Sequence, residues 1–199
     1  MLTRLSVRSA LFVVVAAALL TLSACSVQVD DKKADGKKLD IQTPMGNLHV
    51  SEQANVADTG LSVYPGASQK AEDDSSDKKR ANVNISTKLF ALKVVALEYE
   101  SNDTPAKLVA YYTNELKKFG KVIECHESSD NATLNFGDSN DKSSDNPEDK
   151  VTCGKNDGGD SIELKTGSKG SQHIVAIKPR GKGTDFGLVY VRIHKDAAI

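Results

Sequence analysis

The stretch "ANVNISTKLFALKVVALEYE", residues 81–100, decides the fold. Apolar and polar side chains alternate over residues 83–89 and again over residues 95–99, which is the pattern of a half-buried β-strand. The phase of the alternation shifts over residues 90–92, and a turn or a β-bulge would explain that shift. The pattern therefore favours two strands, although a helix over residues 89–97 fits it as well.

An amphipathic helix is predicted directly after this stretch, over about residues 104–119. Asp103 or Thr104 can cap its start, and Pro105 suits its first turn. Gly120 stands where a left-handed residue commonly ends a helix. An apolar face of this kind must be buried, so we expect the helix to cover a sheet. The residues of that face are Leu108, Tyr112, Leu116 and Phe119.

Short β-like runs occur on both sides of this helix. Residues 39–50 predict a β-hairpin, in which Pro44 presets φ for the turn and Gly46 can take a positive φ. Several short strands at such spacing indicate an antiparallel sheet. The expected fold class is therefore α+β, an antiparallel sheet with one principal amphipathic helix. The other runs lie at residues 121–127, 150–155, 161–167, 173–179 and 186–194.

The composition suits one folded domain with flexible parts and argues against nucleic-acid binding. The 199 residues are 39% hydrophobic and 27% charged, and the net charge is −1. Binding to nucleic acid requires a basic surface, which this balance does not supply. The chain has no tryptophan and only 5% aromatic residues, so few side chains could stack on bases. We expect no nucleic-acid partner.

The first 24 residues have the organisation of an export signal. Arg4 and Arg8 precede an apolar run, Ala10 to Leu20, that is shorter than the roughly 20 residues of a membrane-spanning helix. The sequence "LSAC", residues 22–25, follows and resembles the lipobox of bacterial lipoproteins. An ordinary cleaved secretory signal that happens to precede a cysteine is the alternative.

The lipobox resemblance implies a lipid anchor. Residues 1–24 would be a signal peptide that is removed, and Cys25 would carry a diacylglyceryl group on its thiol and a fatty acid such as palmitate on its amino group. Such chains hold a protein at the membrane without a transmembrane helix. In this family Ser26 favours the outer membrane, facing the periplasm, in a host with two membranes. Residues 25–38 would be the lipidated cysteine and a flexible tether, and residues 39–199 a single α+β domain.

The remaining two cysteines are expected to form a pair. The chain has three cysteines, and lipidation of Cys25 would leave Cys125 and Cys153. In the oxidising compartment that export implies, two cysteines are more often bridged than free. We therefore expect a disulfide at the base of an acidic, Ser- and Asn-rich loop, residues 127–149. Two buried free thiols are the alternative.

A second resemblance concerns the domain itself. The segments "DIQTPMGNLHV" at residues 40–50, "VYPGA" at residues 63–67 and the run over residues 97–122 are the relevant ones. They are similar to segments of uncharacterised bacterial lipoproteins that share a Tyr-Pro-Gly-Ala turn ahead of a strand and an amphipathic helix. This resemblance implies location and fold, and it brings no activity with it.

Three short motifs stand in the order of a β-lactamase signature. They are S-x-x-K at residues 75–78, S-D-N at residues 144–146 and K-T-G at residues 165–167. In that family the serine opens a buried helix, whereas Ser75 lies in a polar segment that a strand is expected to follow. The motifs therefore lack their structural context, and no catalytic residue is predicted.

Two sets of residues have the composition of a metal site without its spacing. Asp138, Asn140 and Asp149 match EF-hand positions, but Lys142 occupies a ligand position between them. The run over residues 178–187 indicates a hairpin turn rather than a phosphate-binding loop, because no helix is expected after it. We predict no metal and no cofactor. A zinc site would have to combine four residues whose spacing matches no compact zinc motif: Cys125, His126, Cys153 and His173.

Together these patterns predict a lipid-anchored protein of the bacterial cell envelope with a non-enzymatic binding domain. Its partner would be another envelope protein, a cell-wall polymer or a small-molecule ligand, bound at a sheet face, a sheet edge or a loop. Two alternatives remain open. One is an envelope enzyme such as a hydrolase, and the other is weak binding of divalent cations by the acidic loop.

Overall fold

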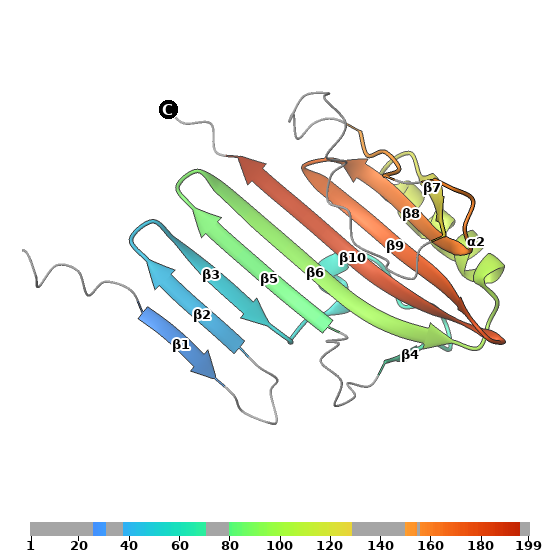
Figure 1. Ribbon diagram of the computed structural model, residues 1–199, viewed down its shortest axis with the longest axis horizontal. Coiled ribbons are helices and arrows are strands. Elements are labelled where there is room, and N and C mark those ends of the chain that lie inside the picture. The colour runs from blue at the N-terminus through green and yellow to red at the C-terminus, as the bar shows by residue number, and fades with distance from the viewer. Residues whose placement is uncertain (1–25, 31–37, 71–79, 129–149, 155, 196–199) are drawn as a thin grey trace, which may run out of the picture.

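A ten-stranded antiparallel sheet forms the body of the protein (Figure 1). The computed structural model describes residues 26–30, 38–70, 80–128, 150–154 and 156–195. The strand order is β1-β2-β3-β5-β6-β10-β9-β8-β7, and β4 pairs with β6 beside this path. The strands are β1 Ser26–Asp30, β2 Lys38–Thr43, β3 Gly46–Ser51, β4 Ser68–Gln69, β5 Arg80–Thr87, β6 Phe90–Ser101, β7 Ile123–Glu127, β8 Ser161–Ser168, β9 Ser171–Arg180 and β10 Gly183–Lys195.

The stretch 81–100 forms the centre of this sheet. It folds as β5 and β6, which pair from Arg80 opposite Leu97 to Ser86 opposite Ala91. The turn between the two strands explains the phase shift in the sequence, and the alternative of a helix over residues 89–97 is wrong. The alternation of polar and apolar residues was therefore sufficient to predict these two strands.

The expected hairpin over residues 39–50 is present as β2 and β3, which pair throughout their lengths. The reason for Gly46 differs from the one expected, because Gly46 does not have a positive φ. A Cβ at this position would lie 2.5 Å from the carbonyl oxygen of Ser86 on β5. Glycine is required there because the neighbouring backbone comes too close for any side chain.

The principal helix is confirmed as α2, Pro105–Leu116, followed by a 3₁₀ turn, η3, Lys117–Phe119. Thr104 is the residue before the helix, but its side chain makes no capping hydrogen bond. Gly120 ends the 3₁₀ turn with a positive φ of 134°, as a glycine at this position was expected to allow, but its ψ of −160° lies outside the left-handed helical region. Strands account for 57% of the described residues, and the protein is thus closer to an all-β fold than the expected α+β class.

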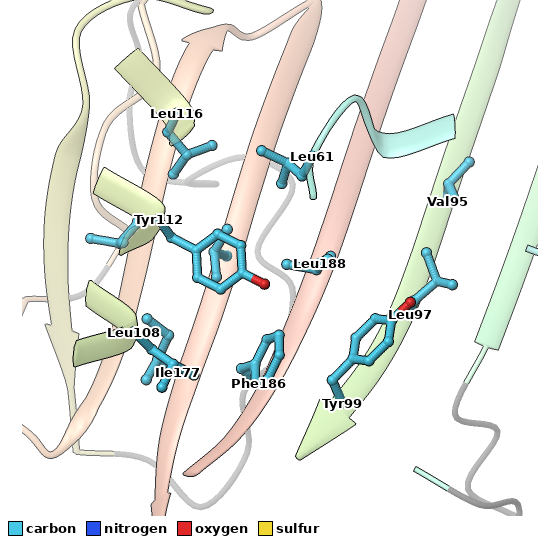
Figure 2. Close-up of a cluster of buried hydrophobic side chains, with 12 residues drawn as sticks. Leu61, Val95, Leu97, Tyr99, Leu108, Tyr112, Leu116, Ile177, Phe186 and Leu188 are labelled. Atoms are coloured by element: carbon cyan, nitrogen blue, oxygen red, sulfur yellow. The ribbon is translucent and has the colours of Figure 1, made fainter. Parts of the chain in front are cut away.

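One face of the sheet is covered over β6, β8, β9 and β10 and contains the main hydrophobic core (Figure 2). The cover consists of α2 and of the segment 52–67, which includes the 3₁₀ helix η2, Val56–Thr59. The side chains of α2 that face the sheet are fully buried, as the helical spacing predicted. Burial of this face explains why a helix of three turns is stable. Core residues include Leu61, Leu97, Leu108, Tyr112, Leu116, Ile177 and Leu188.

The Tyr-Pro-Gly-Ala turn is attached to the start of α2. The Tyr64 backbone N–H donates to the Tyr112 hydroxyl at 3.0 Å, and the Tyr64 hydroxyl donates to Asp103 at 3.0 Å. Lys107 also pairs with Asp103. Hydrogen bonds from Lys107 and Tyr64 hold the pKa of Asp103 below its usual value. The two hydrogen bonds of Tyr64 join segments distant in sequence and fix the loop over the core.

Residues Ser26–Asp30 differ most from expectation. The sequence predicts that they belong to a flexible tether, and the structure instead has them as β1, paired with β2 from Ser26 opposite Gln42 to Asp30 opposite Lys38. The alternation of Val27 and Val29 with polar residues continues the apolar pattern of β2, which is why this segment adds to the sheet. Residues 31–37 lie outside the described chain.

The C-terminal half contains three of the four strands expected after the acidic loop. These are β8, β9 and β10, and residues 121–127 likewise supply β7. Residues 150–155 do not form the predicted strand: Lys150 makes one isolated bridge to Ser168. Among the described residues, no helix has the length and hydropathy needed to cross a membrane.

Candidate binding face

The polar half of the helix-covered side of the sheet is the candidate functional surface. Side chains on neighbouring strands stand directly opposite one another, Asp40 with His49, His49 with Asn84, Asn84 with Lys93, and Lys93 with Arg192. Residues two apart on a strand share a face, so Lys93 lies on the same face as the core residue Val95. We call Asp40, His49, Asn84, Lys93 and Arg192 the central polar row.

The central polar row is held by short polar contacts. Nδ1 of His49 lies 2.5 Å from a carboxylate oxygen of Asp40, and the Asn84 amide donates to Asn82 at 2.9 Å. Lys93 pairs with Asp58 of η2 at 3.4 Å. Cross-strand neighbours of this type have Cβ atoms about 5 Å apart. The row therefore presents donors and acceptors at regular intervals along a line perpendicular to the strands.

Residues 52–67, which follow β3, border this surface on the side nearest the hydrophobic core. Asn82 donates to the Gln53 carbonyl oxygen, and the Ser51 hydroxyl donates to the same oxygen. Beyond it, His173 stacks on Phe119 with ring centroids 3.6 Å apart and lies 2.9 Å from the Thr59 carbonyl oxygen. Burial lowers the pKa of His173, which favours the neutral ring. His173 thus packs at the border of the polar surface.

The chemistry of the central polar row suits binding better than catalysis. About two fifths of the His49 and Asp40 side-chain surface is exposed, and both lie on an open strand face. Acid–base catalysis gains most where groups are enclosed and water is excluded. Hydrogen bonds and the two cationic side chains at one end of the row can instead hold an extended polar ligand.

Of the predicted site residues, the structure brings Cys125 and Cys153 together. Their Cα atoms are 5.6 Å apart and the sulfur atoms are at bonding distance. Cys125 is fully buried in β7. Cys25, the predicted lipidation site, lies outside the described residues, as does most of the acidic loop 127–149.

The catalytic and metal motifs find no support in the part of the chain that the structure describes. Residues 75–78 and 144–146 and the EF-hand positions lie outside it. Within β8, Lys165 forms an ion pair with Glu163 at 2.6 Å, and the buried Thr166 hydroxyl has no hydrogen-bond partner. No group of three or more potential metal ligands occurs among the described residues. Residues 178–187 form the β9–β10 hairpin, as predicted.

Part of the signal for the central polar row is visible in the sequence. Polar residues at 40, 47, 49, 82 and 84 alternate with apolar ones within their strands, and this alternation places them on one face. What the sequence could not supply is the strand order that places His49 opposite Asn84 and Lys93 opposite Arg192. No protein-family model matches this chain, and the comparisons with curated proteins and with solved structures likewise produced no match.

Proposed function

We propose that this is a lipid-anchored protein of the bacterial cell envelope that binds a polar ligand on the central polar row and has no enzymatic activity of its own. The observation that carries the binding proposal is the unbroken line of hydrogen-bonding side chains across five strands of an open sheet face. The anchor is proposed from the sequence "LSAC" at residues 22–25, behind a basic segment and an apolar run. The outer membrane is the proposed location in a host with two membranes.

Replacement of the lipidated residue tests the anchor. In the variant Cys25→Ser, we expect the protein to move from the membrane fraction to the soluble exported fraction and to lose incorporation of a labelled fatty acid. A single acyl chain gives only marginal binding, whereas two or three give a stable anchor. Ser23→Ala, at a small position of the same motif, serves as the control and should remain lipidated. Unchanged membrane partition and labelling of Cys25→Ser would contradict the proposal.

A cell-wall polymer is the ligand that best matches the central polar row. The row is long, since four strand spacings span about 19 Å, and it runs from a carboxylate through an imidazole and an amide to two cationic side chains. A polymer that bears hydroxyl, amide and carboxylate groups can contact several of these side chains at once. Lys93 and Arg192 would pair with its carboxylates, and Asn84 would hydrogen-bond its hydroxyl groups.

Sedimentation with purified peptidoglycan tests this ligand. We expect the protein to sediment with peptidoglycan and Asn84→Ala to weaken binding about fivefold, because one hydrogen bond contributes about 1 kcal/mol. Asn102→Ala removes the same group at an exposed position outside the row and should leave the affinity unchanged. Equal affinities of both variants would exclude the row as the binding site. Release of soluble fragments from peptidoglycan by the protein would favour the hydrolase alternative instead.

A further inference from the structure

The exposed large apolar side chains of the described residues are grouped rather than scattered. Val27 and Val29 of β1 are 60% and 67% exposed. Met45 in the β2–β3 turn is 77% exposed, and Leu89 and Phe90 at the β5–β6 turn are 69% and 39% exposed. Single exposed apolar residues are normal on a protein surface, but a group of them marks an interaction site.

Four of these side chains, all except Val29 opposite Leu39, lie along one end of the sheet. Ser26, where β1 begins, stands opposite Gln42, next to the turn that contains Met45. Gly46 after that turn stands opposite Thr87, where the second turn begins. The start of β1 and both turns therefore follow one another along the same end, as Figure 1 shows. We call Met45, Leu89 and Phe90, with the start of β1, the docking edge, and it spans about 19 Å over four strand spacings.

The predicted lipid anchor directly precedes the docking edge. Ser26 is already part of β1, and Cys25 is the residue before it. Adjacent Cα atoms are about 3.8 Å apart, so no tether separates a lipid on Cys25 from the sheet. Acyl chains on Cys25 would enter the bilayer beside the three exposed side chains of the two turns.

The charges at this end of the sheet match a lipid surface. The two turns with their adjoining strand ends, residues 42–48 and 86–92, and the end of β10, residues 192–195, contain no aspartate or glutamate. Among the basic residues of these segments, Lys88 is exposed and lies in the turn next to Leu89. At the opposite end, β6 continues with Glu98 and Glu100. Basic groups near a bilayer are attracted to its anionic headgroups.

We propose that the docking edge rests in the headgroup region of the membrane, with Met45, Leu89 and Phe90 inserted between the lipids. This inference rests on the lipid anchor proposed above. It adds that the domain has one fixed orientation on the membrane, because an anchor and a row of apolar contacts hold it at separate points.

A single tryptophan introduced at the docking edge would report the contact, since the chain has none of its own. We expect Leu89→Trp in the lipidated protein, reconstituted into phosphatidylethanolamine and phosphatidylglycerol vesicles, to emit at shorter wavelength than in detergent-free buffer without lipid. Bromine atoms on the acyl chains should remove most of this emission. Lys182→Trp, in the exposed β9–β10 turn at the opposite end of the sheet, is the matched control and should keep its emission.

Flotation of the same vesicles separates the two proposals. Protein that floats with the vesicles while Leu89→Trp is unquenched, or quenched no more than Lys182→Trp, would overturn the docking edge and leave the anchor intact. Protein that does not float would overturn the anchor, and the docking edge with it. Met45→Trp on the neighbouring turn provides a second probe if Leu89→Trp does not fold, and quenching of Met45→Trp beyond that of Lys182→Trp is the expected result.

Discussion

Leu108→Ala is expected to lower the free energy of unfolding by about 4 kcal/mol. Leu108 lies in the first turn of α2 and is fully buried against the sheet. Truncation of a buried leucine loses its apolar contacts and leaves a cavity that the surrounding residues fill only in part. A helix of 12 residues has little stability by itself, so weakened packing of α2 also weakens the cover of the core. Urea denaturation followed by circular dichroism measures the change.

Asn114→Ala is the control for this experiment. Asn114 is exposed on the same helix, and alanine is the better helix former there. Its free energy of unfolding should remain within about 0.5 kcal/mol of the wild-type value. A loss of less than about 1 kcal/mol in Leu108→Ala would mean that α2 does not pack on the sheet as described.

Removal of the Cys125–Cys153 bridge is expected to cost about 3.5 kcal/mol. The two residues are 28 positions apart, and a cross-link of this span restricts the unfolded chain by about that amount. Cys125 lies in β7, which is an edge strand of the sheet and pairs with β8. The double variant Cys125→Ala/Cys153→Ala should therefore unfold at lower urea concentration than the oxidised wild-type protein.

A reductant provides the control for the bridge. Wild-type protein with reductant should approach the stability of the double variant, whereas the double variant should not respond to reductant. Equal stability of the wild-type protein with and without reductant, together with two titratable thiols in its unreduced form, would contradict the disulfide and support two free cysteines.

The elements that the sequence predicts well are those with a complete local pattern. The helix has four apolar residues at helical spacing and a proline in its first turn. The stretch 81–100 alternates so regularly that its turn is visible as a shift of phase. These local signals were sufficient because the contacts made in the folded protein favour the same secondary structure as the local pattern.

The elements that the sequence predicts poorly depend on distant neighbours. Val27 and Val29 alternate in a segment of five residues, which is too short to distinguish a strand from a tether until β2 is placed beside it. Residues 150–155 have apolar content, but Val151 and Cys153 pack at the base of the acidic loop without joining the sheet. The central polar row required the strand order, because its members are far apart in sequence.

The direction of the strands has a consequence for the membrane orientation proposed above. Asp40 is three residues from Thr43, the end of β2 at the docking edge, which corresponds to about 10 Å along a strand. Because its members stand opposite one another across the sheet, the central polar row runs parallel to that edge. With the edge resting on the membrane, a bound polymer would lie flat above the bilayer at a constant height, and the protein would act as a spacer between the two layers.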